Sequence, residues 1–243
     1  MTGQIYIGTS GWNYPHWRGP FYPEALTADQ WLQYYSSQLQ CVEINNSFYR
    51  LPETLTFRQW AGQTPQEFCF AVKASRFITH LKKLKACKGA LKTFLAHSKG
   101  LGKKLGPVLF QLPPRWHANP QRLAEFLAWL PKDWRYTFEF RDPDWHNNEI
   151  YHLLSERNIA FCIYELGGFQ SPMIVTADFI YVRLHGPKEA YCGSYRKQTL
   201  ARWAARLKDW QRDNKDVYIF FDNDEAGYAA DNALKLNELI TLG

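Results

Sequence analysis

The sequence lacks the features that mark membrane, secreted and zinc-binding proteins. No apolar run approaches the roughly 20 residues that a membrane-spanning helix needs. The opening stretch MTGQIYIGTSGW has no basic start followed by an apolar segment, as a secretory signal would have. The five cysteines are widely spaced and none forms a CxxC pair, which disfavours a disulfide framework or a zinc site. We therefore expect a cytoplasmic protein with reduced thiols.

The sequence does contain enough apolar residues for a large core. It has 243 residues, of which 46% are hydrophobic, and 10 Trp, 14 Tyr and 16 Phe exclude a disordered chain. Short apolar or alternating segments, typical of strands, lie at 4–9, 41–45, 68–74, 106–112, 136–141, 159–165, 179–186 and 216–224. Segments of helical period lie between most of them, at 27–39, 120–130, 148–157, 198–213 and 226–240.

Strands that alternate with helices over this length predict an α/β fold, a TIM-like (β/α) barrel formed by residues 1–243 as one domain. Residues 166–178 have too little helical pattern for a crossover helix, so we expect an irregular crossover between the sixth and seventh strands. A doubly wound open sheet is the alternative. The absence of a GxGxxG or GxxxxGK[ST] turn disfavours it.

Polar residues end nearly every predicted strand, often two positions apart and therefore on one face. This set comprises Glu43, Asn45, Lys73, Gln111, Glu139, Arg141, Arg183, His185, Asp222 and the adjacent Asn223. In a barrel these side chains would meet at the C-terminal mouth, where active sites are built. Because burying unpaired charges is costly, the repetition indicates a site; the alternative is a structural ion-pair network. Arg141 fits a ligand contact or a brace to Glu139 or Glu43 equally well.

The loop after the first strand, residues 8–23, is rich in aromatic residues. Trp12, Trp17, Phe21 and Tyr22 would form either a stacking wall for a sugar or base, or a hydrophobic lid on the barrel. The backbone N–H groups of residues 8–11 are a candidate anion nest.

The excess positive charge is concentrated in one segment. Residues 82–104 contain eight lysines and no acidic residue, whereas the whole chain carries +6. Apolar residues recur there at helical spacing, and Lys85, Lys88, Lys92, Lys99 and Lys103 would form a stripe on another face. Such a stripe is either a solvated helix face or a surface for nucleic acid.

The ordered motifs also resemble a known family. GTSGW (8–12), VEINNSFYRLP (42–52), FEFR (138–141), YVRLHG (181–186) and YIFFDNDEAGYAADNA (218–233) are similar to the YecE-like family, domain of unknown function 72, over essentially the whole chain. The resemblance implies a TIM barrel but supplies no reaction. Its motif residues correspond to Glu43, Asn45, Phe48, Tyr49, Lys73, His80, Gln111, Glu139, Arg141, Arg183, His185 and Asn223.

Three functions follow from these residues. The first is a hydrolase for a phosphodiester or other phosphate-bearing substrate, nucleic acid included, with Glu43, Glu139, His185 and Asp222 as catalytic residues and a divalent metal as an optional cofactor. The substrate-binding residues would be Trp12, Asn45, Tyr49, Lys73, His80, Gln111, Arg141, Arg183 and Asn223. The second is a glycoside hydrolase that uses Glu43 and Glu139. The third is a non-catalytic barrel that binds an anion or RNA; the oligomeric state stays open.

Overall fold

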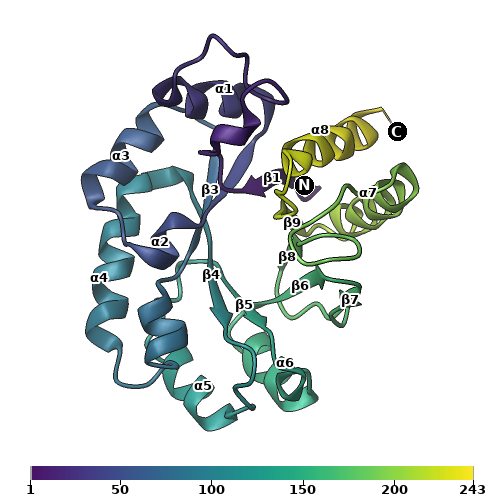
Figure 1. Ribbon diagram of the computed structural model, residues 1–243. Helices are drawn as coiled ribbons and strands as arrows, with labels where there is room; N and C mark the ends of the chain where they lie inside the picture. The colour runs from purple at the N-terminus through teal and green to yellow at the C-terminus, as the bar shows by residue number, and fades with distance from the viewer. Residues whose placement is uncertain (1, 243) are drawn as a thin grey trace.

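Eight parallel strands close into a barrel in the computed structural model, which describes residues 2–242 (Figure 1). The strands follow the order β5-β4-β3-β2-β1-β9-β8-β6, and pairing between β5 and β6 closes the ring. A ninth short strand, β7, adds to β6 in an antiparallel direction. The predicted TIM-like barrel is therefore confirmed, and the doubly wound sheet is excluded.

The eight barrel strands match the predicted segments, with ends shifted by three residues at most, and β7 lies within the irregular stretch 166–178. They are β1 (Ile5–Ser10), β2 (Cys41–Ile44), β3 (Cys69–Lys73), β4 (Leu105–Leu112), β5 (Tyr136–Phe140), β6 (Ala160–Leu166), β7 (Phe169–Gln170), β8 (Phe179–Leu184) and β9 (Asp216–Phe221). The helices are α1 (Trp31–Gln38), α2 (Asn46–Tyr49), α3 (Thr54–Gly62), α4 (Lys88–Ser98), α5 (Pro120–Leu127), α6 (Asn148–Ser155), α7 (Lys197–Arg212) and α8 (Tyr228–Thr241). No helix within residues 2–242 has the length and apolar character needed to cross a membrane.

Side-chain caps define where two of the outer helices begin. The Asn119 side chain accepts a hydrogen bond from the Arg122 backbone N–H at 2.9 Å, just before Pro120 at the first position of α5. The Asn147 side chain does the same for Ile150 at the start of α6, at 3.1 Å. These contacts satisfy N–H groups that have no partner within a helix.

The crossover from β6 to β8 has no helix, as the sequence predicts. Instead, the chain turns back along β6, and two side-chain hydroxyls replace the missing backbone partners. Ser171 Oγ accepts the N–H of Tyr164 at 2.8 Å, and Thr176 Oγ1 accepts the N–H of Phe161 at 2.7 Å. The segment therefore satisfies backbone groups of β6 without a helix.

Successive strand residues divide between the two sides of the sheet. Outward residues such as Val42, Phe70 and Phe138 join the core between strands and helices. Inward residues fill the barrel and include Cys41, Cys69, Ala71, Leu109, Cys162, Tyr181 and Phe220. Burial raises the pKa of the Cys41 and Cys162 thiols well above its usual range, so both remain protonated. The interior below the mouth is thus filled by side chains, as in other barrels of this type.

The lysine-rich segment is not one continuous helix. Its first residues form a turn with positive φ at three positions, α4 begins only at Lys88, and Gly102 adopts a non-helical conformation within the 3₁₀ segment 99–104. The five lysines expected to form a stripe are all exposed, but they are distributed over these three segments. The prediction of one aligned stripe is therefore wrong, because the chain changes direction between the lysines.

The close contact of β1 with β2 generates a stability prediction. A Cβ atom added at Gly8 would lie 2.1 Å from the Cys41 backbone oxygen, whereas one added at Gly89 in α4 would meet nothing within 4 Å. We expect Gly8→Ala to lower the free energy of unfolding by about 1–3 kcal/mol, since the sheet backbone must shift. Gly89→Ala, the control, should raise it by about 0.5–1 kcal/mol. Urea unfolding measures both, and equal midpoints for Gly8→Ala and wild type would contradict the prediction.

Candidate functional site

A fully buried arginine holds the mouth of the barrel together. Arg183 on β8 donates from Nη2 to Glu43 Oε1 and from Nη1 to Glu139 Oε2, both at 2.7 Å. Its Nη2 also donates to Asp222 Oδ2 at 3.1 Å, just after β9. Arg183, Glu43 and Glu139 have no exposed surface. Carboxylates that lie far apart in the sequence are therefore held by one guanidinium group, whose planar arrangement of N–H groups fits carboxylate oxygens.

Hydroxyl groups complete the coordination of Glu43. Ser10 Oγ at the end of β1 donates to Oε1 at 2.7 Å, and Tyr181 on β8 donates to Oε2 at 2.6 Å. Both oxygens of Glu43 are thus engaged. Those of Glu139 are engaged too, since Arg141 Nε donates to Oε1 and Arg183 holds Oε2.

His185 lies between two guanidinium groups and a carboxylate. Its Nε2 is 3.0 Å from Arg141 Nη2 and 3.2 Å from Arg183 Nη1, and its Nδ1 is 2.9 Å from Asp222 Oδ2. Because arginine nitrogens only donate, Nε2 must accept, and the ring proton belongs on Nδ1 facing Asp222. The orientation of the His185 ring is therefore fixed by two guanidinium groups and one carboxylate.

The ion pairs keep the buried carboxylates charged. Burial alone would raise the pKa of Glu139, but the charges of Arg141 and Arg183 outweigh it and hold that pKa well below its usual range. Burial also acts against ionisation of Asp222, yet contact with His185 and the charge of Arg183 lower its pKa. These groups are ionised at neutral pH and have no proton to donate.

A second set of groups is open to the mouth. Lys73 Nζ and Arg141 Nη1 make no hydrogen bond within residues 2–242, and both nitrogens are accessible rather than enclosed. The same is true of the Gln111 amide and of His80 Nε2. Burial, followed by the charge of Lys73, lowers the pKa of His80 to about 4, so this ring is neutral. Apart from one oxygen of Asp222, the open groups are therefore cations or neutral polar groups.

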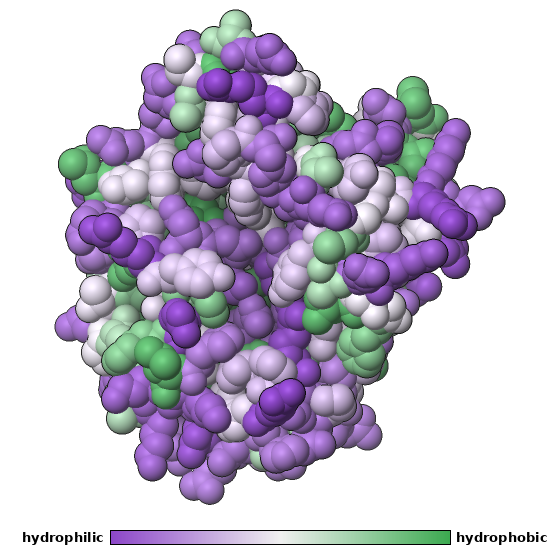
Figure 2. Space-filling model, viewed as in Figure 1, coloured by the Kyte–Doolittle hydropathy of each residue, from purple (hydrophilic) through white to green (hydrophobic). Residues whose placement is uncertain are grey.

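A hollow of about 340 Å³ lies beside Arg141 at the ends of β4, β5 and β6. Arg141 and Gln111 supply its polar groups, and Tyr164, Phe169 and Tyr191 supply aromatic rings. The Arg141 guanidinium lies 5.0 Å from the Tyr164 ring centre, whereas Tyr191 and Phe169 are 48% and 44% exposed. In Figure 2, drawn from the same side as Figure 1, hydrophilic residues gather around the middle of the face between α2 and β7. The hollow combines a cation with flat apolar walls.

The fold and these motif residues agree with a family comparison. Residues 6–242 match the family model described as "Protein of unknown function DUF72". The chain belongs to the DUF72 family. A curated relative, UPF0759 protein YunF of Bacillus subtilis (strain 168), is 28% identical over 281 residues. The match covers 98% of this chain and 95% of that protein. UPF0759 protein YecE of Escherichia coli (strain K12) is 31% identical over 142 residues, which span 57% of this chain and 49% of that protein.

Crystal structures of DUF72 proteins have the same architecture. A family member from Thermotoga maritima superposes with a TM-score of 0.87 at 29% identity, covering 98% of this chain and 99% of that one. One from Enterococcus faecalis superposes with a TM-score of 0.84 at 20% identity, covering 99% and 96%. The second likeness concerns the fold alone.

The structure brings most of the predicted site residues together. Hydrogen bonds, ion pairs or the shared mouth unite Glu43, Lys73, His80, Gln111, Glu139, Arg141, Arg183, His185 and Asp222. The interpretation as a structural ion-pair network is also correct in part, since both terminal nitrogens of Arg183 pair with buried carboxylates, while its Nε has no partner within residues 2–242. Arg141 has the expected role of a brace, since its Nε donates to Glu139, and its Nη1 stays open.

Four predicted substrate-binding residues lie elsewhere. Asn223 faces away from Asp222 and donates to Gly193 O and to Asn232 Oδ1, so it braces a loop against α8. Trp12 and Asn45 line a different groove, between the loop after β1 and α3. Tyr49 is 75% exposed on α2, outside the hollow beside Arg141.

Sequence reasoning missed several residues of the site. Ser10 ends β1, and Tyr181 faces inward two residues before Arg183, yet neither is among the predicted site residues. Tyr164 and Tyr191 gave no signal apart from their aromatic character. Asp224 was also missed: burial raises its pKa to about 6, against hydrogen bonds from Trp17 and His16.

The aromatic loop after β1 is a lid rather than a stacking wall. Trp17 and Tyr22 are fully buried, and the Tyr22 ring stacks on that of Trp31 at 4.9 Å. The expected anion nest is not formed either. Residues 8–10 belong to β1, and the Thr9 N–H donates to the Tyr35 hydroxyl at 3.0 Å.

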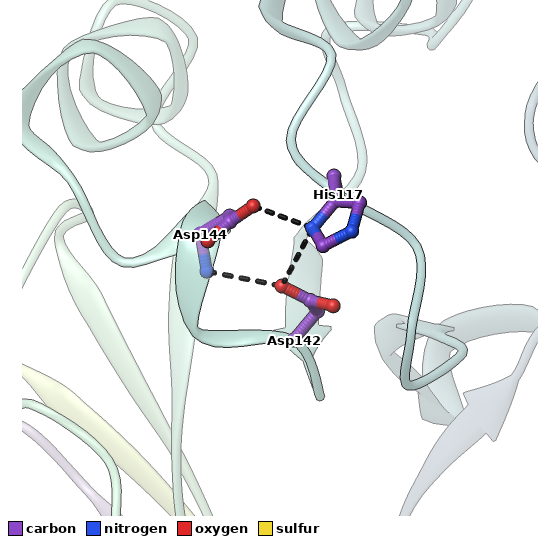
Figure 3. A group of neighbouring side chains, drawn as sticks. All are labelled: His117, Asp142 and Asp144. Carbon is purple, nitrogen blue, oxygen red and sulfur yellow. Dashed lines mark hydrogen bonds and ion pairs between the residues drawn. The ribbon is translucent and has the colours of Figure 1, made fainter.

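One group within residues 2–242 has the spacing of a metal site, and it lies outside the arginine network. His117, Asp142 and Asp144 place one ligand atom each within 4.8 Å of one another (Figure 3). His117 Nδ1 is 2.6 Å from Asp144 Oδ2, and Asp142 Oδ1 accepts the backbone N–H of Asp144 at 3.1 Å. These contacts are those of an exposed hydrogen-bonded turn. Glu43, Glu139 and Asp222, for which the sequence left a divalent metal open, pair with Arg183.

The arginine network yields a prediction on stability and pH. Arg183→Met leaves Glu43 and Glu139 buried with too few partners, and breaking such pairs costs about 3–5 kcal/mol. The loss should be smaller at pH 4 than at pH 7. In the wild type, the ion-paired Glu139 has a lowered pKa, so it stabilises the folded state at neutral pH, and this stabilisation is lost as the pH falls below the pKa of an unfolded glutamate. In the variant, acid instead protonates the unpaired carboxylates and thereby relieves their buried charge.

Urea unfolding at the two pH values measures this difference. Arg212→Met is the control, because Arg212 pairs with Asp209 on the exposed face of α7 and should contribute less than about 1 kcal/mol. An equal loss for Arg183→Met at pH 4 and pH 7 would show that ionised carboxylates are not the cause.

Proposed function

We propose that this DUF72 protein binds a small organic anion at the barrel mouth, one with a phosphate or carboxylate group and a flat apolar body. The observation that carries the proposal is the separation of charge. Glu43 and Glu139 are enclosed and saturated by hydrogen bonds, while Lys73 Nζ and Arg141 Nη1 remain open. A ligand entering the mouth therefore meets positive charge first.

The hollow beside Arg141 suits such a molecule. Arg141 is held by Glu139 on one side and packs on Tyr164, so its open nitrogen points with little freedom. A guanidinium fixed in this way binds phosphate or carboxylate oxygens well. The exposed Tyr191 and Phe169 rings provide the contact for an apolar body.

This geometry favours binding over the two hydrolase hypotheses. A glycosidase needs one carboxyl group that donates a proton and a second that reacts or activates water. Here Glu139 is held ionised, and both Glu43 oxygens accept hydrogen bonds from buried partners. For phosphodiester hydrolysis, His185 would have to release Arg141 and Arg183 before its Nε2 could act as a base. The phosphate-bearing substrate class remains part of the proposal.

Binding of nucleic acid is a prediction from the sequence, and we do not include it in the proposal. A polymer would require a continuous basic track, and the exposed lysines of residues 82–104 are distributed over a turn, α4 and a 3₁₀ segment. The mouth itself fits a single anionic group more simply.

Calorimetry with phenyl phosphate and inorganic phosphate tests the proposal. Loss of one charge-assisted hydrogen bond costs about 1.5–3 kcal/mol, so Arg141→Met should weaken phenyl phosphate binding about ten- to hundredfold. Tyr191→Ala, at an exposed position, should weaken phenyl phosphate by about two- to tenfold and leave inorganic phosphate unchanged, because only the ring contact is lost.

Arg58→Met is the matched control, since Arg58 is an exposed arginine on α3. It should bind both anions as the wild type does. Wild-type affinity for phenyl phosphate in Arg141→Met and Tyr191→Ala alike would exclude this hollow as the binding site.

A further inference from the structure

The end of β3 places a lysine amine in an unusual setting. Lys73 follows Ala71 on the inward face of the strand, at the level of the mouth. Its Nζ makes no ion pair or hydrogen bond within residues 2–242, although the buried network next to it contains three carboxylates. Those carboxylates are held by Arg183, so they leave the amine without a partner.

The chain holds an aromatic ring against this amine. Ser47 Oγ lies 2.7 Å from the Lys73 backbone oxygen and 3.0 Å from Ile44 O, and thereby ties α2 to the ends of β2 and β3. This contact positions Phe48, the next residue, with its ring centre 4.5 Å from Lys73 Nζ. The Phe48 ring also packs on His80, at 4.9 Å between ring centres. One side of the amine is therefore covered by apolar surface and a neutral imidazole.

Four charged groups and one neutral imidazole surround Lys73. Arg183 on β8 opposes its protonation, while Glu43, Glu139 and Asp222 favour it, and His80 on the segment after β3 is neutral. Burial is the largest effect and, together with Arg183, lowers the pKa of Lys73 to about 8. A lysine that is desolvated beside another cation is the usual form of an amine nucleophile.

We propose that Lys73 is a nucleophile that forms an imine with the carbonyl group of a small aldehyde or ketone bearing an anionic group. The amine nitrogen attacks the carbonyl carbon, a C–N bond forms, and a carbinolamine results. Its C–O bond then breaks, and the oxygen leaves as water with the two protons of the amine. The product is a C=N bond between Lys73 and the ligand, without any change in oxidation state.

This proposal rests on the anion site proposed above and identifies the ligand further. β4, which carries Gln111, lies between β3 and β5, so Lys73 and Arg141 are two strands apart. Neighbouring strands are about 4.8 Å apart, and the span between the two is about 10 Å. A molecule the size of one aromatic ring, with a carbonyl at one end and an anionic group at the other, bridges that distance.

Reductive trapping tests the proposal. The protein is incubated with 4-formylbenzoate and cyanoborohydride, and the modified lysines are located by peptide mass spectrometry as a gain of one probe mass less one oxygen. We expect Lys73 to be labelled at pH 7 about tenfold or more faster than Lys88 and Lys92, two exposed lysines of α4. Its labelling rate should reach half of its maximum near pH 8, whereas that of ordinary lysines reaches half of its maximum only near pH 10.4.

Three variants separate this proposal from the proposed function. Lys73→Arg keeps the charge and should lose the fast adduct, and Lys88→Arg should retain it. Arg141→Met should slow labelling by 4-formylbenzoate about tenfold and leave labelling by uncharged benzaldehyde unchanged. If Arg141→Met has no effect but Lys73 is still labelled rapidly, the anion site is wrong and the nucleophile stands. Labelling of Lys73 at the rate of Lys88 and Lys92, or an unchanged fast adduct in Lys73→Arg, overturns the nucleophile.

Discussion

The mouth of this barrel depends on one buried guanidinium. Arg183 satisfies Glu43 and Glu139 at once, and these two carboxylates come from strands β2 and β5 on different sides of the ring. Without that cation the two acids would be buried charges, which a protein interior does not tolerate. The arrangement of the other polar groups follows from it: Arg141 and His185 are positioned against the same pair, and Lys73 is left without a carboxylate.

This architecture separates stability from ligand contact. In the enclosed layer of Ser10, Glu43, Tyr181 and Arg183, both oxygens of Glu43 and both terminal nitrogens of Arg183 are already bonded, so a bound molecule has little to add to them. The layer above it contains open donors and loop aromatics and has few internal bonds. Residues held in a fixed lower layer are well suited to orient groups above them, a common way to prepare a site before its ligand arrives.

Much of the site could be predicted because strands have a simple period. Glu139 with Arg141, and Arg183 with His185, are two residues apart and share the inward face. The same alternation turns Asn223 away from the side that Asp222 faces, and Asn223 bonds to Gly193 and Asn232 instead. The strand period does not predict which charged side chains pair with one another. Tyr191 lies in a loop without any periodic signal, and its place beside His185, at 5.4 Å between rings, depends on the fold.

The inward thiols described with the barrel have a practical meaning. Cys41, Cys69 and Cys162 lie inside the closed sheet on β2, β3 and β6, where burial keeps them protonated and unreactive. A thiol in this position reacts with a reagent only when neighbouring strands part. The rate at which each thiol is modified therefore measures local opening of the barrel. Cys41 and Cys69 detect opening on one side of the ring, and Cys162 detects it on the other.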